Sequence, residues 1–205
     1  MYNLEHANKV DLLDRNNKEI KVSVDAYFKQ DVPLVYGDGS VEANIVLVGE
    51  APGRYEIEKG KPFVGQAGKN LDEFMDILQL KREDIYITNV VKFRPYRIND
   101  KTGRISNRPP TKEEISLCRP FLRRELGIIE PKLLVSLGNV PLKCLTGDEA
   151  ATIGEYHGKP ITINFTGSNM ILFPLYHPAS IIYRAELKSV YIEDLHKLKD
   201  YMLSQ

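Results

Sequence analysis

Short, continuous apolar runs alternate along this chain with longer segments in which apolar residues recur at helical spacing. A continuous run rich in β-branched residues is typical of a strand that is buried on both faces, as in a sheet covered by helices on each side. Such runs predict four strands of a central sheet. They cover Asn44–Val48, Ile85–Thr88, Lys132–Leu137 and Met170–Leu175.

The segments between these runs predict helices. From Gly68 to Leu80, apolar residues follow i, i+3, i+4 and i+7 spacing, which marks one face of a helix. A helix from Thr111 to about Leu126 begins with a capping box of Thr111 and Glu114, and Pro120 is expected to kink it. Two further helical segments are predicted, over residues 1–30 at the edge of the domain and over Ser189–Leu203.

The order of these elements predicts the fold class. Strands that alternate with helices imply right-handed crossovers and a mainly parallel sheet, so we expect a three-layer α/β/α architecture. The segment from Gly158 to Phe165 is expected to form part of a hairpin with the last strand. At 205 residues, the chain has the length of a single domain over residues 1–205.

Composition restricts the classes of partner and compartment. The 28 basic and 28 acidic side chains cancel, so a polyanion would have to be held by a local basic patch. No apolar run reaches the ~18 residues of a membrane span and no signal-peptide pattern is found, so we expect a cytoplasmic protein without membrane contact. Cys118 and Cys144 have no CxxC spacing, which favours reduced thiols over a disulfide or a metal site.

Polar side chains follow three of the predicted strands directly: Glu50, Asn89 and His177. Ligands of open α/β sheets bind beyond the carboxyl ends of the strands, so these residues can converge although they are far apart in the sequence. Each residue alone is compatible with a turn or a packing role, as is Phe63 with a place in the core. Together they predict an enzyme active site. The stretch Gly49–Gly53 lacks the Lys-Ser/Thr of a P-loop, which disfavours nucleoside triphosphate hydrolysis.

Five segments, in matching order over roughly residues 35 to 200, resemble the family 4 uracil-DNA glycosylases. They are Gly49–Gly53, Gly60–Gly68, Thr88–Lys92, Asn107–Thr111 and His177–Ala179. The resemblance implies an α/β enzyme of DNA repair that removes uracil from DNA by hydrolysing the N-glycosidic bond. It also implies substrate-binding roles for five residues. Phe63 would stack on the flipped uracil, Asn89 would read its polar edge, Glu56 would shield C5, and Gly49 and Ala51 would border the base.

The chemistry of this reaction assigns catalytic roles to two residues. Cleavage leaves negative charge on the departing uracil, and His177, as a neutral imidazole facing O2, would donate to it. Glu50 would orient the attacking water and stabilise the cationic sugar. Because a uracil within a duplex is inaccessible, the base must be extruded, and Ile181 or Ile182 is a candidate wedge, with helix packing as the alternative.

Phosphate contacts are expected from a basic segment beside the Asn89 strand. Between residues 92 and 108, six cations stand against Asp100 alone, although such a run can also be an ordinary solvated face. The cations are Lys92, Arg94, Arg97, Lys101, Arg104 and Arg108. The candidate DNA contacts are Lys92, Arg94, Arg108, Ser180, Ile181, Ile182 and Arg184.

The chain departs from the family pattern in two places. Typical members hold a [4Fe–4S] cluster with four cysteines, but here the stretch Val22–Phe28 has none, Phe93 occupies the third position and only Cys118 remains. One thiolate cannot hold such a cluster, so we expect no metal and no cofactor, with Phe93 and neighbouring apolar groups filling the volume. The stretch Tyr96–Ser106 is longer than the usual connection, and an ordinary mobile loop is one interpretation of it.

Three functions remain open at this point. The favoured one is an active, monomeric uracil-DNA glycosylase that lacks the cluster and acts on uracil-containing DNA. The second is a glycosylase whose preference has shifted to another deaminated base. The third is a non-catalytic protein that binds DNA or a nucleotide with the same fold, although intact Glu50, Phe63, Asn89 and His177 argue against it.

Overall fold

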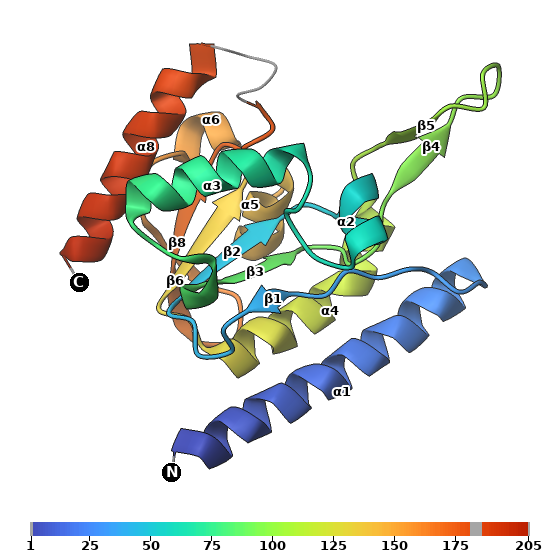
Figure 1. The fold of residues 1–205 in the computed structure, drawn as a ribbon, viewed down its shortest axis with the longest axis horizontal. Helices are drawn as coiled ribbons and strands as arrows, with labels where there is room; N and C mark the ends of the chain where they lie inside the picture. Colours follow the sequence, from blue (N-terminus) through green and yellow to red (C-terminus); the bar gives the residue numbers. More distant parts are fainter. Residues whose placement is uncertain (1, 181–185, 205) are drawn as a thin grey trace.

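A computed structural model describes residues 2–180 and 186–204, and its centre is a six-stranded sheet of order β1-β3-β2-β6-β8-β7 (Figure 1). The four inner strands run parallel, and the short outer strands β1 and β7 are antiparallel to their neighbours. The strands are β1 (Asp38–Gly39), β2 (Ile45–Gly49), β3 (Tyr86–Asn89), β6 (Leu133–Leu137), β7 (Ile161–Asn164) and β8 (Asn169–Leu175). The four predicted strands are confirmed to within one residue, and β7, within the segment predicted to form part of a hairpin, pairs antiparallel with β8.

Helices cover both faces of the sheet, which confirms the three-layer architecture. The helices α3 (Gln66–Leu78) and α8 (Glu186–Leu203) pack on one face. The helices α1 (Tyr2–Phe28), α4 (Lys112–Ile129) and α5 (Asn139–Thr146) pack on the other. In β2, Leu47 faces the first core whereas Val46 and Val48 face the second. Successive side chains of a strand point to opposite faces, so a strand with a core on each face is apolar throughout.

The long helices agree with their predicted positions. Residues 2–28 form one continuous helix, α1, which lies along α4, and the Asn16 amide donates a hydrogen bond to the Phe121 carbonyl oxygen at 3.1 Å (Figure 1). The capping box is confirmed, since the Thr111 hydroxyl accepts from the Glu114 N–H and the Glu114 carboxylate accepts from the Thr111 N–H. Helix α4 continues through Pro120 and ends at Ile129.

Several short elements were not predicted. They are α2 (Arg54–Lys59), η1 (Arg82–Asp84), α5, α6 (Ile153–Tyr156), β1, β4 (Tyr96–Ile98) and β5 (Ile105–Asn107). Strands β4 and β5 pair antiparallel, so the stretch Tyr96–Ser106 forms a hairpin instead of an irregular loop. Figure 1 shows this hairpin projecting away from the rest of the molecule.

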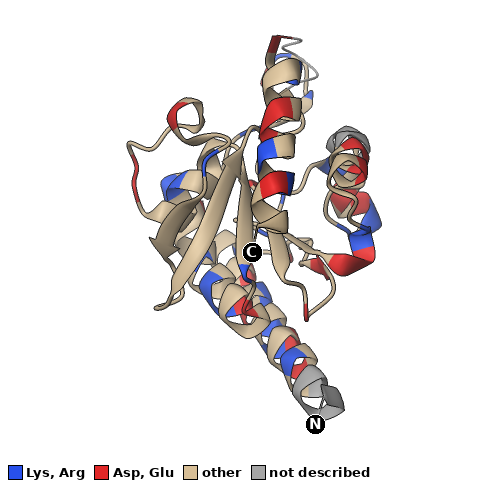
Figure 2. Ribbon diagram, turned by 90° about the vertical axis from the view of Figure 1, so that its left-hand side faces the viewer, with Lys and Arg blue, Asp and Glu red and all other residues tan. Residues whose placement is uncertain are grey.

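Charged residues are frequent along the helices. In Figure 2, blue and red segments follow the helices, while the broad strands facing the viewer are tan. Within residues 2–180 and 186–204, no helix combines the length and the apolar character needed to cross a bilayer.

Candidate active site

A cavity of about 490 Å³ opens beside the carboxyl ends of β2, β3 and β8. Phe63, Asn89 and His177 line it together, so two of the three predicted strand-end residues, Asn89 and His177, meet at one cavity. Ala51, Gly53 and Glu56 form another part of the wall, and the hairpin contributes Arg104, Ser106 and Asn107. Glu50 directly precedes Ala51 at the end of β2, but its side chain is not among those that line the cavity.

The surroundings of His177 define its protonation and its tautomer. Its Nδ1 accepts a hydrogen bond from the Ala179 N–H at 3.1 Å. Burial lowers the pKa of His177 to about 4, against an opposing effect of Glu56, so the ring is neutral near pH 7. A neutral ring with Nδ1 as acceptor carries its proton on Nε2. His177 therefore has an Nε2–H donor that is not used by the turn.

Phe63 stands beside His177 in a loop with unusual backbone geometry. The two rings stack with centroids 5.9 Å apart and an interplanar angle of 27°. Phe63 has a φ of +52°, which is rare for a residue with a side chain, and the Arg82 guanidinium donates to the carbonyl oxygens of Pro62 and Phe63. The ring is only 6% exposed and also touches the core, so it joins the cavity wall to the packed interior.

Gly49 allows Asn89 and Phe63 to approach the end of β2. A Cβ at Gly49 would clash with the Asn89 amide oxygen and would lie 2.8 Å from the Phe63 ring. Asn89 is 3% exposed and pairs with Gly49 across β2 and β3. Within the described part of the chain, no side chain or backbone group hydrogen-bonds to the Asn89 amide, which leaves it available to a ligand.

The two carboxylates near the cavity differ in their surroundings. Both oxygens of Glu56 accept backbone N–H groups, from Gly53 at 3.1 Å and from Gly65 at 2.8 Å, so its carboxylate joins the loops before α2 and α3. Burial raises the pKa of Glu50 above its usual value, and among the described residues none donates a hydrogen bond to its carboxylate. The Glu56 carboxylate is therefore held in place by backbone donors, whereas the Glu50 carboxylate can still accept hydrogen bonds from water or substrate.

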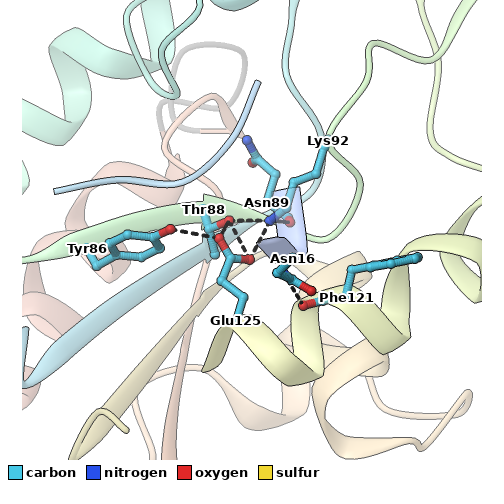
Figure 3. A network of polar contacts seen from close by, with 7 residues as sticks. All are labelled: Asn16, Tyr86, Thr88, Asn89, Lys92, Phe121 and Glu125. Carbon is cyan, nitrogen blue, oxygen red and sulfur yellow. Dashed lines mark hydrogen bonds and ion pairs between the residues drawn. The ribbon is translucent and has the colours of Figure 1, made fainter. Parts of the chain in front are cut away.

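The prediction that Lys92 contacts DNA is wrong. Its side chain is 1% exposed, and its Nζ lies 2.6 Å from Glu125 of α4, whose side chain is also 1% exposed. The ammonium also donates to the Thr88 hydroxyl and, at 2.9 Å, to the Asn89 carbonyl oxygen, and Tyr86 and Thr88 donate to Glu125 (Figure 3). Strand β1 pairs with Tyr86 and Ile87 of β3 and does not extend alongside Asn89. The Asn89 carbonyl oxygen, which a longer strand would pair, accepts its hydrogen bond from the Lys92 ammonium instead.

Sequence reasoning missed Glu125, although a signal for it exists. Cys118, Leu122 and Ile129 form an apolar stripe on α4, and Glu125 occupies the stripe position between Leu122 and Ile129. An acidic residue within a buried stripe indicates a buried cationic partner, because an unpaired buried charge is costly. The cavity-lining residues of the hairpin were also missed as parts of the substrate site.

The other proposed DNA contacts have different positions. Arg94 lines the cavity and donates from Nε to the Asn107 amide oxygen at 2.7 Å. Arg108 forms a bidentate pair with Glu114, with both distances 2.7 Å, and donates to the Tyr96 carbonyl oxygen, so it joins the base of the hairpin to α4. The Ser180 N–H donates to the His177 carbonyl oxygen. Ile181, Ile182 and Arg184 lie outside the described residues.

The residues at the expected cluster position do not fit an iron–sulfur cluster. Phe93 is 2% exposed, and its ring contacts Phe28 edge-on with centroids 5.0 Å apart. Cys118 is buried against the Lys92 backbone, and burial raises the pKa of its thiol to about 11, which disfavours the thiolate that iron requires. The second cysteine, Cys144, is also buried, with a pKa raised to about 11. In the described ranges, no three His, Cys, Asp or Glu side chains gather as a metal site.

Comparison with known proteins gives consistent matches. A family model described as the uracil DNA glycosylase superfamily matches residues 36–198. The chain is similar to the type-4 uracil-DNA glycosylase of Archaeoglobus fulgidus, with 41% identity over 173 residues that cover 83% of this chain and 82% of the relative. The enzyme of the same name from Saccharolobus solfataricus is 37% identical over 95% of this chain and 86% of its own length. That of Sulfurisphaera tokodaii is 38% identical over 83% and 75%.

Proposed function

The chain belongs to the uracil-DNA glycosylase superfamily and is a DNA repair glycosylase that hydrolyses the N-glycosidic bond of uracil; from this premise, we propose how its own side chains carry out the reaction. The extruded uracil enters the cavity of about 490 Å³ and stacks on Phe63. The Asn89 amide, which is free to pair, reads its polar edge beside Gly49. Glu56, fixed by two backbone N–H groups, excludes the methyl group that distinguishes thymine from uracil.

His177 supplies the donor for the departing base. The C1′–N1 bond breaks, its electron pair moves onto the uracil ring, and the Nε2–H donates to O2 as negative charge develops there. The single observation that supports this role best is the hydrogen bond from the Ala179 N–H to Nδ1, which assigns the proton of the neutral ring to Nε2. Donors aimed at developing charge stabilise the transition state more than the ground state.

Glu50 acts on the other side of the broken bond. Its carboxylate orients a water molecule whose oxygen bonds to C1′, accepts the proton that this water loses, and stabilises the cationic sugar. The absence of a protein donor to this carboxylate among the described residues, together with its place at the end of β2, supports the assignment. Water is the second reactant. Glu50 passes the proton that it has accepted to solvent and the departing uracil anion takes up a proton from solvent, so the products are free uracil and an abasic site.

We propose that this chemistry needs no cofactor and one copy of the chain, acting on uracil-containing DNA in the cytoplasm. The buried thiols of Cys118 and Cys144, which do not suit a cluster, support the absence of a cofactor. Arg94 at the cavity wall and Ser180 beside His177 are the retained DNA contacts. The wedge role of Ile181 or Ile182 and the phosphate contact of Arg184 stay proposals.

The base specificity is tested directly with defined substrates. The purified protein is incubated with oligonucleotides that carry uracil, hypoxanthine, xanthine or a thymine mismatch, and alkali then cleaves any abasic site. We expect strand cleavage at uracil and none at thymine. Cleavage at another deaminated base in preference to uracil would indicate the shifted specificity, and no cleavage at any base would indicate a non-catalytic binding protein.

A further inference from the structure

The β4–β5 hairpin is joined firmly to the wall of the cavity at its base. Arg108 pairs with Glu114 at the start of α4, and the Arg108 N–H donates to the Pro95 carbonyl oxygen. Arg94 and Asn107, which both line the cavity, hydrogen-bond to each other. The hairpin therefore leaves the molecule at a defined place beside the cavity, and Figure 1 shows it projecting outward.

The two faces of the hairpin differ in chemistry. Residues that pair across antiparallel strands share a face, so Arg97 and Ser106 lie on one face and Ile98 and Ile105 on the other. Arg97 donates from Nε to the Ser106 hydroxyl at 3.2 Å. The isoleucine face is more than half exposed at both positions. The Arg97 face is thus a polar surface with an arginine held in place.

The cavity continues onto this polar face. Arg104 and Ser106 line the catalytic cavity and also a second hollow of about 570 Å³. The second hollow is lined further by Arg97, Asn99, Ile98 and the acidic Asp100, and Ile105 also reaches the catalytic cavity. The two hollows share these lining residues, so the surface of the hairpin adjoins the catalytic cavity. A chain that places one unit in the cavity can therefore lay its neighbouring units on the hairpin.

The charge of the hairpin suits a polyanion. Between residues 94 and 107, four cations stand against one acidic residue, Asp100. None of these four forms an ion pair with an acidic side chain in the part of the chain that the structure describes. They are Arg94, Arg97, Lys101 and Arg104. Because the whole chain is neutral, this excess is local and adjoins the site where a phosphodiester backbone has to pass.

We propose that the polar face of the β4–β5 hairpin is a DNA-binding arm. Arg97 and Arg104 bind backbone phosphates of the strand whose uracil enters the cavity. This inference rests on the proposed function and adds to it the surface that holds the flanking nucleotides. Guanidinium groups bind phosphate oxygens in pairs and carry no base information, so the arm fixes the position of the strand without selecting a sequence.

The arm is tested by binding to undamaged DNA, which involves no excision. The double variant R97Q/R104Q is compared with the parent and with R124Q, which removes a cation that pairs with Glu19 on the α1 side of α4. Affinity for a fluorescent single-stranded oligonucleotide is measured by anisotropy over a series of salt concentrations. The plot of log K against log salt has a negative slope, and each lost phosphate contact makes it shallower by about 0.7. We therefore expect the slope of the double variant to be shallower by about 1.4.

We expect weaker binding by R97Q/R104Q at low salt, a difference that shrinks as salt rises, and parent-like behaviour of R124Q. The proposed DNA-binding arm would be contradicted if the double variant kept the salt slope of the parent, or if R124Q lost as much affinity as the double variant. It would also be contradicted if binding by the parent did not depend on salt. Failure of the parent to excise uracil would instead overturn the proposed function and leave the binding comparison intact.

Discussion

At the scale of single residues, backbone contacts prepare the side chains of the site for their chemistry. The Ala179 N–H selects the tautomer of His177, and two backbone N–H groups fix Glu56. Glu50 receives no such donor from the described residues, and burial raises its pKa. The same type of side chain thus acts as a fixed wall at Glu56 and as an open acceptor at Glu50.

The pH dependence of the rate follows from Glu50. A carboxyl group whose pKa is raised loses its charge at a higher pH than an ordinary glutamate, and only the charged form orients and deprotonates water. We expect the single-turnover rate to fall on acidification with a midpoint above 4.5, the usual value for Glu. In E50Q the rate is lower and this limb is lost, while His177, whose pKa burial lowers to about 4, stays neutral above that pH. An identical acid limb in E50Q would contradict the role of Glu50.

Gly49 is predicted to be required by close approach and not by flexibility. In G49A the new methyl group clashes with the Asn89 amide oxygen and crowds the Phe63 ring, so we expect a large loss of uracil excision. The matched control is G127A, on α4, where a Cβ meets no atom within 4 Å and alanine favours the helix by about 0.5–1 kcal/mol. Equal activity of both variants would show that uracil excision does not require the close approach of Asn89 and Phe63 to Gly49.

At the scale of elements, the sequence predicts those helices and strands whose packing against the core gives them a periodic or continuous pattern of apolar residues. Strand β2 is predicted to within one residue because Val46, Leu47 and Val48 face two cores in turn. The short helices α2 and α6 have too few residues for a periodic apolar pattern. The strands β4 and β5 have 3 residues each, which is too short for their alternation of apolar and polar residues to identify them.

The site residues that the sequence predicts are likewise those that follow from a regular pattern. Glu50, Asn89 and His177 are predictable because parallel topology brings strand ends to one edge. Lys92 is not, because its partner Glu125 lies 33 positions away and only packing brings the two together. From the sequence, Lys92 is one cation in a basic run, whereas in the structure it supports the carbonyl of Asn89 between β3 and α4.

The buried pair gives a stability prediction at this scale. K92M leaves Glu125 buried without its cation, which we expect to lower the free energy of unfolding by about 3–5 kcal/mol, as measured by urea denaturation. The double variant K92M/E125L removes both charges and should regain part of this loss. R124Q, which breaks the exposed pair with Glu19, is the control and should cost about 0–1 kcal/mol. A loss in K92M no larger than that in R124Q would show that the pair contributes little.

At the scale of the whole molecule, the candidate site lies at the carboxyl ends of the parallel strands, while the helices on both faces of the sheet form the two cores. The packed region around Phe28, Phe93 and Cys118 lies in the core shared by α1 and α4. Aromatic rings occupy the position where the family resemblance implies cluster ligands. The contacts described there are apolar and aromatic.

The protein is accordingly expected to be colourless and free of iron when purified without oxygen. C118S should retain activity and cost about 1 kcal/mol of stability, as is usual for a conservative change at a buried site. Iron and sulfide analysis, visible absorbance and thermal unfolding check these points. Stoichiometric iron and sulfide, or loss of activity in C118S, would contradict a cluster-free fold.

The most direct test of the central claim compares H177A with the parent, and with H196A on the exposed side of α8 as the control. Loss of one transition-state donor typically lowers the rate by about 10²–10³-fold, or about 2.7–4 kcal/mol. The single-turnover rate of uracil excision in H177A should fall by that factor, while its equilibrium affinity for uracil-containing DNA and the rate of H196A stay close to those of the parent. An H177A protein that excises uracil at the parent rate, or whose binding falls in parallel with its rate, would contradict the role of His177 as the donor to the departing base.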